Sequence, residues 1–448
     1  MNIRPNRSAW RVAAVVAVIG LVAAACGGSS SKSTSSSTAN TSGTNTASAP
    51  GITATTITIG SHQPLTGPAA PGYSEIAPAS TAMFKYVNAH GGVYGRSINY
   101  IYEDDGYNPA NTATVVRKLV LQDNVFAIFD GLGTPTHEAV LSFLQTEKVP
   151  DLFVASGCDC WDNPTQDPET FGFQTDYTIE AKVLASYEQA HYKGEKVGYL
   201  FQNDDFGQGG VKGFDQEIPS SDVVSRQSYD ATAAGLANGL GNQVSAIKAA
   251  GAKVVMLDTI PVATALTLLA AAEIGYSPVW IVSSVGGDPP TLAGLLSSIS
   301  KGKAGASLEN GVISASYLPS FSDTTNPWIT LFKSIHDQYD ASEPWDGNTV
   351  FGMAVAYTFV QTMHAAGRNP TRADVVKALE TDGGSFTGPG LVPLGYSTTH
   401  HNGYVGEQIG VVENGAFNMS GPVYRTTDSS GTPVTTYSGT QPAPPSTF

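Results

Sequence analysis

The hydrophobic positions of the chain follow two alternating rhythms from Thr56 onward. Short runs that are apolar through most of their length predict β-strands. They cover residues 56–65, 97–105, 125–131, 151–156, 196–205, 222–230, 253–260, 279–284 and 311–318. Between these runs, apolar residues recur at helical spacing, and further helical patterns cover 327–340, 348–367 and 371–381. The alternation predicts an α/β fold.

Strands that are mostly apolar and separated by helices form parallel sheets that are covered on both faces. Two consecutive series of such strands therefore predict two doubly wound lobes. In sheets of this kind, ligands bind beyond the carboxyl ends of the strands. The segments that follow the strands are residues 62–67, 103–105, 131–134, 155–157, 203–205, 258–259 and 283–284.

Composition narrows the functions that these lobes can have. The 448 residues carry a formal net charge of −15, whereas a nucleic-acid partner requires a basic face. Three cysteines exclude a disulfide scaffold or a Cys-rich metal site. The sequence has no H-E-x-x-H, G-x-S-x-G or Walker A motif, so we predict no enzymatic activity, metal or cofactor.

The acidic clusters at 103–105 and 204–205 allow two interpretations. Paired carboxylates could hold a metal ion or hydrolyse a glycoside. Both clusters follow predicted strands, however, where aspartate commonly caps turns and helices without any chemistry. We favour the capping interpretation.

The first 25 residues are typical of an export signal, with three arginines before an apolar core at 12–22. The run Ala23-Ala24-Ala25-Cys26 resembles a bacterial lipobox, which predicts lipidation of Cys26. The alternative is a plain secretory signal in which Cys26 has no role. Residues 26–53 are rich in Ser and Thr and predict a disordered tether between a membrane anchor and the folded body.

An ordered set of motifs resembles a known family. The motifs are PLTGPAA at 64–70, NAHGGVYGRSINYIYEDD at 88–105, DGLGTPTHEAVLSFLQTEKVP at 130–150, LFVASG at 152–157, QNDDFGQGGVKGFD at 202–215 and MAVAYTFVQTMHAAGRNPTRADVVKAL at 353–379. From about residue 54 to 420 the chain resembles the type I periplasmic solute-binding proteins of the branched-chain amino acid ABC importer family.

The resemblance implies two doubly wound lobes joined by a three-segment hinge. Lobe 1 would comprise 54–176 and 314–386, and lobe 2 would comprise 177–313 and 387–448 with a C-terminal tail. Members of this family are monomers that close around a small solute and deliver it to a membrane permease without chemical change. The chain would then be lipid-anchored at the extracytoplasmic face of the cell membrane.

The resemblance also implies a set of ligand-binding residues. Gly133 and Thr134 match a carboxylate-binding turn at a helix start, although the glycine also suits a tight turn. The segment that meets the same carboxylate is 156–158. Further candidates stand near strand ends or at the crossover between lobes. The full set is Gln63, Tyr73, Gly133, Thr134, Ser156, Gly157, Cys158, Tyr177, Thr259 and Ser284.

Cys158 and Cys160 are the cysteines that remain once Cys26 is lipidated. In an oxidising compartment, two cysteines so close in sequence can form a small-loop disulfide. Two free thiols are the alternative, because sequence does not establish their spacing.

Ser284 stands at or near the position where amino acid binders of this family place a carboxylate for the ligand's ammonium group. A buried ammonium without a charged partner costs several kcal/mol. Asp258, at the end of the preceding strand, or Asp288 could supply that carboxylate, but neither can be placed from the sequence. We therefore expect a small carboxylate, amide or aromatic compound rather than leucine, isoleucine or valine. Two other functions remain open at this point: a sensory receptor, and an extracytoplasmic hydrolase on the same fold.

Overall fold

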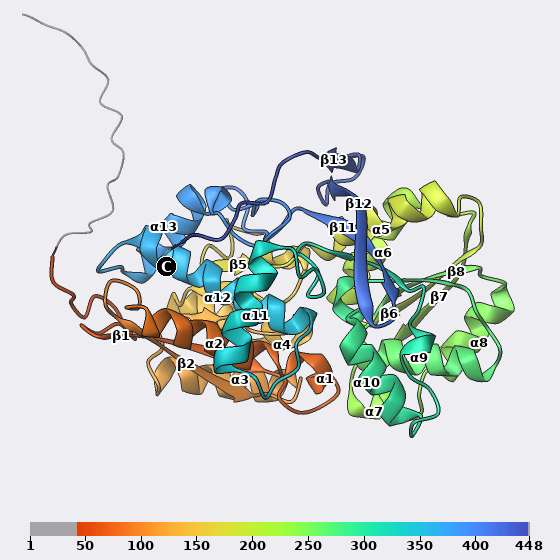
Figure 1. Cartoon of the computed structure of the whole chain (residues 1–448), viewed down its shortest axis with the longest axis horizontal. Coiled ribbons are helices and arrows are strands. Elements are labelled where there is room, and N and C mark those ends of the chain that lie inside the picture. The colour runs from red at the N-terminus through yellow and green to blue at the C-terminus, as the bar shows by residue number, and fades with distance from the viewer. Residues whose placement is uncertain (1–42, 447–448) are drawn as a thin grey trace, which may run out of the picture. The chain divides into compact units, whose positions relative to one another are not determined.

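Two β-sheets organise residues 43–446, the part of the chain that the computed structural model describes (Figure 1). The first sheet is parallel throughout, in the order β2–β1–β3–β4–β5. Its strands are β1 (Thr56–Gln63), β2 (Ser97–Asp104), β3 (Ile128–Phe129), β4 (Asp151–Val154) and β5 (Thr170–Gly172). We call this sheet and its covering helices lobe 1.

Helices from both early and late parts of the chain cover this sheet, which Figure 1 shows as orange and blue ribbons. Side chains of successive strand residues point to opposite faces. Phe129 therefore packs in the core with α2 and α12, whereas Ile128 packs with α3 and α4. The helices are α1 (Ala70–Tyr73), α2 (Ile76–Ala89), α3 (Pro109–Leu121), α4 (Thr134–Glu147), α11 (Pro327–Tyr339), α12 (Gly347–Ala366) and α13 (Arg372–Asp382).

The second sheet has the order β13–β12–β11–β10–β9–β8–β6–β7 and defines lobe 2. The strands from β10 to β7 are parallel, and β11 to β13 add an antiparallel edge. The strands are β6 (Val197–Gln202), β7 (Val223–Tyr229), β8 (Val254–Asp258), β9 (Val279–Val282), β10 (Ile313–Ser316), β11 (Gly406–Glu413), β12 (Ala416–Arg425) and β13 (Thr435–Tyr437).

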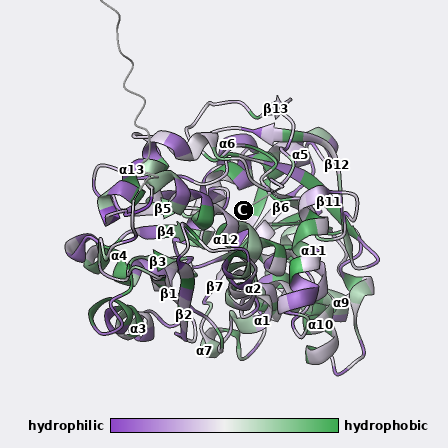
Figure 2. Cartoon of the chain, turned by 60° about the vertical axis from the view of Figure 1, so that its left-hand side comes forward, coloured by the Kyte–Doolittle hydropathy of each residue, from purple (hydrophilic) through white to green (hydrophobic). Residues whose placement is uncertain are grey.

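The same alternation builds the two faces of the second sheet. Tyr199 and Met256 pack towards α5 and α6, whereas Leu200 and Leu257 pack towards α8 and α9. The colouring of Figure 2 shows hydrophobic and hydrophilic residues together in the covering helices, as expected when one side of each helix faces a sheet. The helices are α5 (Tyr177–His191), α6 (Asp205–Glu217), α7 (Ala233–Leu236), α8 (Gly241–Ala250), α9 (Pro261–Glu273) and α10 (Pro289–Ile299).

The predicted architecture of two doubly wound α/β lobes is confirmed, with two differences at the lobe boundaries. Strand β10 pairs with β9 and β11, so the chain leaves lobe 2 after Ser316 rather than before residue 314. The segment 387–404 was predicted in lobe 2. Its apolar side chains Val392, Leu394, Tyr396 and Tyr404 instead pack in the core of lobe 1, because burial there removes them from water.

The segment 44–53 differs from the prediction of a tether that continues to residue 53. Ile52 is buried and pairs with Ile57, and Asn45 donates hydrogen bonds to the carbonyl oxygens of Ala54 and Tyr94. The Arg96 guanidinium also donates to the Thr46 carbonyl oxygen at 2.9 Å. Specific polar contacts and one buried apolar side chain therefore hold this segment against lobe 1.

The C-terminal segment contacts both lobes. The buried Lys182 ammonium of lobe 2 donates to the carbonyl oxygens of Thr427, Ser429 and Thr432 at 2.8–3.0 Å. Further along, the Trp328 indole of lobe 1 donates to the Pro442 carbonyl oxygen at 2.6 Å. None of the helices within residues 43–446 combines the length and apolar composition that a membrane crossing requires.

Candidate ligand-binding site

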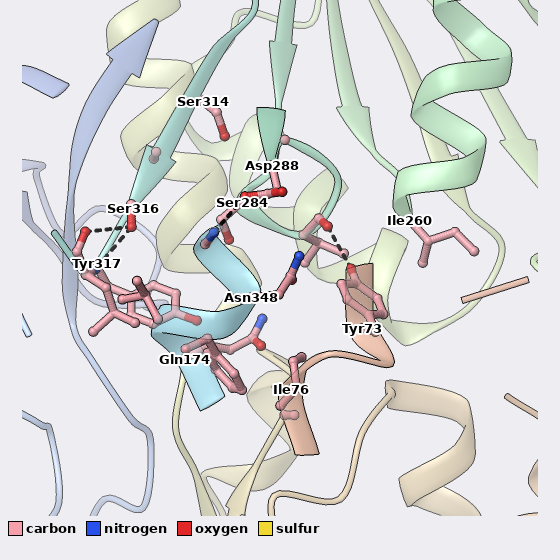
Figure 3. Close-up of a pocket in the computed structure, with 18 of the residues that line it drawn as sticks. Tyr73, Ile76, Gln174, Ile260, Ser284, Asp288, Ser314, Ser316, Tyr317 and Asn348 are labelled. Carbon is pink, nitrogen blue, oxygen red and sulfur yellow. Dashed lines mark hydrogen bonds between the residues drawn. The ribbon is translucent and has the colours of Figure 1, made fainter. Parts of the chain in front are cut away.

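A cavity lies between the two lobes, at the carboxyl ends of their parallel strands (Figure 3). Hydrogen bonds between the lobes surround it. The Tyr73 hydroxyl of lobe 1 donates to the Val285 carbonyl oxygen at 2.7 Å, and the Gln202 amide of lobe 2 donates to the Tyr107 hydroxyl at 3.3 Å. Hydrogen bonds that join the walls of an inter-lobe cavity are typical of a closed arrangement.

Five of the residues predicted from the sequence line this cavity. They are Tyr73, Gly133, Thr134, Tyr177 and Ser284. The turn before α4 requires glycine at position 133 for two reasons. The φ of 102° is unfavourable for other residues, and a Cβ at this position would lie 2.5 Å from the Tyr107 ring. Glycine thus lets the start of α4 approach the cavity.

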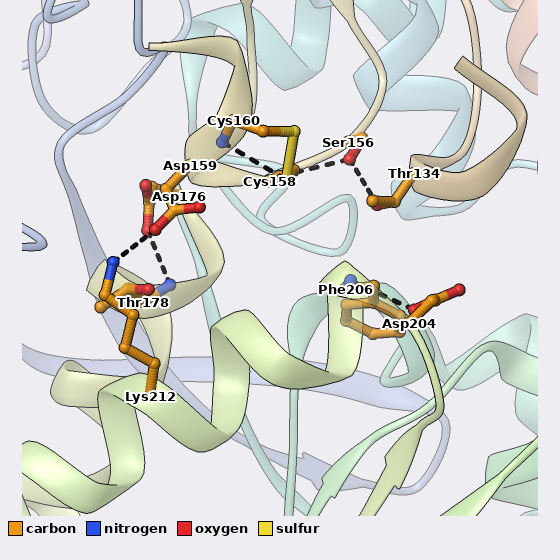
Figure 4. The surroundings of a disulfide bond; sticks show 10 residues. All are labelled: Thr134, Ser156, Cys158, Asp159, Cys160, Asp176, Thr178, Asp204, Phe206 and Lys212. Carbon is orange, nitrogen blue, oxygen red and sulfur yellow. Dashed lines mark hydrogen bonds and ion pairs between the residues drawn. A yellow bond between two sulfur atoms is a disulfide. The ribbon is translucent and has the colours of Figure 1, made fainter. Parts of the chain in front are cut away.

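Ser156, Gly157 and Cys158 do not line the cavity but lie directly behind it. The Ser156 and Thr134 hydroxyls share a hydrogen bond of 2.6 Å, and Ser156 Oγ accepts from the Cys158 amide at 3.3 Å (Figure 4). Gly157 accepts the Tyr177 amide at 2.6 Å through its carbonyl oxygen. This segment therefore positions Thr134 and Tyr177 rather than facing the cavity itself.

Cys158 and Cys160 form a disulfide in the short turn that follows this segment (Figure 4). Cys158 is buried against Trp161 and Tyr177 in a small apolar cluster. The disulfide thus lies immediately next to the residues that support the cavity wall.

Tyr177 begins α5 at the crossover between the lobes. Asp176 caps this helix, and its Oδ1 accepts from the amides of Thr178 and Ile179. Burial raises the pKa of the Tyr177 phenol to about 12, so the group remains a neutral donor. Its ring packs on Phe206 with 4.5 Å between ring centroids.

Gln63 and Thr259 lie away from the cavity, unlike our expectation. The Gln63 amide donates to Ser61 Oγ at 2.9 Å and to the Asp130 carbonyl oxygen at 2.5 Å, and the side chain is fully buried. Thr259 is fully buried and shares a hydrogen bond with Thr264. A strand-end position places a residue at the right edge of the sheet, but the alternation of side chains decides whether it faces the cavity.

Ser284 has a buried carboxyl group behind it. Glu180 of α5 is 2% exposed and accepts the Ser284 backbone amide. Burial raises the pKa of Glu180 to about 7. Glu180 does not line the cavity, so this carboxyl supports the backbone at Ser284 instead of meeting a ligand.

Asp288 does line the cavity, and both of its carboxylate oxygens are engaged. Oδ2 accepts from the Thr291 amide at 3.1 Å and its hydroxyl at 2.7 Å, which caps α10 in lobe 2. Oδ1 accepts from the Gly347 amide at 2.9 Å, at the start of α12 in lobe 1. One carboxylate therefore satisfies helix N-termini from both lobes.

Two further carboxyl groups of lobe 1 face Asp288. Burial, followed by the charge of Asp346, raises the pKa of Asp288 to about 7. Burial and the neighbouring Asp346 carboxyl raise the pKa of Glu75 to about 9. Carboxyl groups held this close together cannot all ionise cheaply, so the cluster retains protons at neutral pH.

The acidic clusters singled out in the sequence act as caps and structural partners. Asp204 caps α6 by accepting from the Phe206 amide, and Asp104 accepts from the Thr66 amide. Asp105 is fully buried against His62. The carboxylates of Asp159, Asp176 and Asp428 also lie within 4.8 Å of one another, but the Lys212 ammonium pairs with Asp159 at 2.5 Å.

Most of the cavity wall could not be read from single motifs. Sequence reasoning missed an apolar and aromatic set of lining residues from both lobes. These are Ile76, Tyr107, Leu132, Phe206, Ile260, Tyr317, Leu318, Phe321, Val350, Phe351 and Phe417. One signal was available for Asp288, because an aspartate before Pro289-Pro290 is typical of a helix N-cap.

Comparison with known proteins places this geometry in context. The family model described as periplasmic binding protein matches residues 56–415. No curated protein matches the chain. Among solved structures, a substrate-binding periplasmic protein from Ralstonia solanacearum is 22% identical, with a TM-score of 0.72 over 81% of this chain and 100% of that chain.

Two other solved structures share the fold at similar identity. A fatty acid ABC transporter substrate-binding protein from Thermomonospora curvata is 20% identical, with a TM-score of 0.74 over 89% of this chain and 98% of that chain. A branched chain amino acid ABC transporter protein from Thermus thermophilus with bound valine is 20% identical, with a TM-score of 0.71 over 83% of this chain and 97% of that chain. At this identity the likeness concerns the fold.

Proposed function

Because the chain belongs to the periplasmic binding protein family, we propose that it is the extracytoplasmic solute receptor of an ABC importer. It would capture a small solute between its lobes and present the closed form to a membrane permease. The observation that carries the proposal is the cavity at the strand ends, walled by both lobes and bridged by hydrogen bonds between them. Burying a solute there gives it a higher affinity for the closed state, which a partner can detect.

The proposal includes a lipid anchor at Cys26, which lies outside the described residues. An acyl chain on Cys26 would hold an acidic protein at a membrane whose lipids do not attract it. Cys26→Ser should release the protein from the membrane fraction and remove the acyl mass from the mature N-terminus. Unchanged membrane retention of the variant would contradict the anchor.

Capture of the partner in living cells tests the importer role. A photo-crosslinking residue would replace exposed Ala110 of lobe 1 or exposed Gln208 of lobe 2, both near the carboxyl ends of strands. Exposed Lys193 precedes β6 at the opposite end of its sheet and serves as the control position. We expect the first two positions to capture a multi-span permease subunit and Lys193 to capture none.

Two other outcomes would contradict this role. Capture of a signalling protein in place of a permease would identify a sensory receptor. Turnover of a captured solute by the purified protein would identify a hydrolase.

A further inference from the structure

The walls of the cavity are rich in aromatic side chains from both lobes. They include Tyr107, Tyr177, Phe206, Tyr317, Phe351 and Phe417. Aromatic rings offer large apolar faces with few rotatable bonds, and they bury a ligand body of similar character. The body of the cargo should therefore be apolar and bulky.

The cavity offers an ammonium group no carboxylate that is free of other hydrogen bonds. Among the described residues that line it, Asp288 is the one with a carboxyl group, and none is a lysine, arginine or histidine. Both oxygens of Asp288 accept backbone amides at helix N-termini, one in each lobe. A ligand group at Asp288 would compete with the Gly347 amide for Oδ1, and so with the hydrogen bond that joins the lobes.

The second possible partner is also engaged. The Glu180 carboxyl accepts the Ser284 amide behind the cavity wall and is 2% exposed. The Ser284 side chain itself lies in the cavity wall (Figure 3). An α-ammonium of a bound amino acid would meet a hydroxyl there, and it would remain buried without a counter-charge.

One end of the cavity does suit a carboxyl group. Helix α4 begins there, and its N-cap Gly133 has no side chain to accept from the Thr134 amide, whereas Pro135 at the second position has no amide hydrogen. Thr134 adds a hydroxyl at the same place. A helix start and a hydroxyl stabilise a carboxylate without any cation.

Building on the importer role, we propose that the cargo is a monocarboxylate with a bulky apolar, preferably aromatic, body and no amino group. The carboxyl group meets the start of α4, and the body lies among the aromatic side chains. Ser284 is the residue that determines this specificity, because it presents a neutral hydroxyl in the cavity wall while its backbone amide engages the Glu180 carboxyl.

Matched pairs of compounds test the proposal directly. Calorimetry would compare 3-phenylpropanoate with L-phenylalanine, and 4-methylpentanoate with L-leucine, because each pair differs in the α-amino group alone. We expect the compound without the amino group to bind at least ten-fold more tightly in both pairs. Equal or tighter binding of either amino acid would overturn the proposal, and so would failure of both carboxylates to bind.

Two further compounds test the two ends of the proposed cargo, its carboxyl group and its apolar body. We expect 3-phenylpropanamide, which lacks the charge, to bind less tightly than 3-phenylpropanoate. Tighter binding of the amide would overturn the carboxylate assignment. Decanoate tests a linear chain, and tighter binding of decanoate than of 3-phenylpropanoate would overturn the preference for a compact aromatic body.

Substitutions at Ser284 test its role. Ser284→Asp supplies a carboxylate, and Ser284→Asn is a matched control of the same size without the charge. We expect S284D to tighten L-phenylalanine and weaken 3-phenylpropanoate, each by at least ten-fold, and S284N to leave L-phenylalanine weak. Equal effects of both variants on L-phenylalanine would overturn the role of Ser284.

The outcomes separate this proposal from the importer role. Tight amino acid binding together with capture of a permease would remove the cargo assignment and leave the importer role standing. Preference for the carboxylates together with capture of a signalling protein would remove the importer role and leave the cargo assignment standing.

Discussion

The imidazoles of His62 and His137 share a hydrogen bond of 2.9 Å between Nε2 of His62 and Nδ1 of His137, and both side chains are fully buried. The chain of contacts continues to Asp105 at 2.8 Å on one side and to Asp151 at 2.7 Å on the other. These three contacts tie together buried polar side chains of β1, α4, β4 and the segment after β2. Burial lowers the pKa of the His62 imidazole.

Removing one side chain from this hydrogen-bond network should destabilise the fold, because the neighbouring polar groups stay buried without partners. We expect His137→Leu to lower the free energy of unfolding by about 3 kcal/mol or more, measured by urea denaturation. His90 of the same lobe is exposed, and His90→Leu should change the free energy of unfolding by less than about 0.5 kcal/mol. Equal losses in the two variants would contradict a stabilising network.

Asp288 should control the equilibrium between open and closed lobes. Asp288→Ala removes the acceptor shared by Thr291 and Gly347, so the distance between the lobes should increase in scattering or spin-label measurements. Thr371→Ala is the matched control, because it removes a helix cap from exposed α13 within lobe 1. Both variants should lose roughly 1 kcal/mol of stability, but only the first should open the lobes. An unchanged distance in Asp288→Ala would rule out this role.

The buried Glu407 should make stability depend on pH. Burial raises the pKa of Glu407 well above its usual range, and Glu407 is fully buried on β11. The folded state therefore binds a proton that the unfolded state releases above about pH 4.5, so its stability falls as pH rises from there towards the raised pKa. Glu407→Gln removes this dependence.

The gain in stability from Glu407→Gln should therefore grow by up to about 1.4 kcal/mol per pH unit over that interval, measured by urea denaturation at several pH values. Exposed Glu413 lies on the same strand, and Glu413→Gln is the control that should show no such trend. A gain that is constant between pH 5 and pH 8 would refute the assignment.

The disulfide between Cys158 and Cys160 closes a very short loop. In the chain-entropy account, a loop of this length stabilises by roughly 1–2 kcal/mol. The double variant Cys158→Ser, Cys160→Ser should lose about that much in chemical denaturation, and reduced wild-type protein should match it. No difference between oxidised and reduced wild-type protein would contradict the prediction.

Most of the parallel strands could be predicted from the sequence, whereas the short parallel strand β5 (Thr170–Gly172) and the antiparallel edge could not. The run 253–260 contains β8, which is apolar up to its last residue because both faces of the strand are covered. The run 56–65 contains β1, in which Ile57 and Ile59 alternate with polar residues. Strands β11 and β12 have exposed positions and a weaker pattern. Asn414-Gly415 between them has positive φ at both residues, a hairpin signal that the sequence did contain.

Some residues of the candidate site could likewise be predicted from the sequence, and others could not. Gly133 and Thr134 follow a strand and open a helix, so local pattern places them at the carboxyl edge of the sheet, where the cavity lies. Phe351 belongs to α12, which is buried almost throughout, so periodicity cannot tell which of its sides faces the cavity. The partners of Asp288 also lie in different lobes, and only the packed tertiary structure brings them together.

Segments 44–53 and 441–442 both contact lobe 1, although most of lobe 2 lies between them in the sequence. A mechanical load applied through these two segments would pass across lobe 1 and leave lobe 2 unstrained. Lobe 2 would keep its freedom to rotate while the rest of the molecule is under tension.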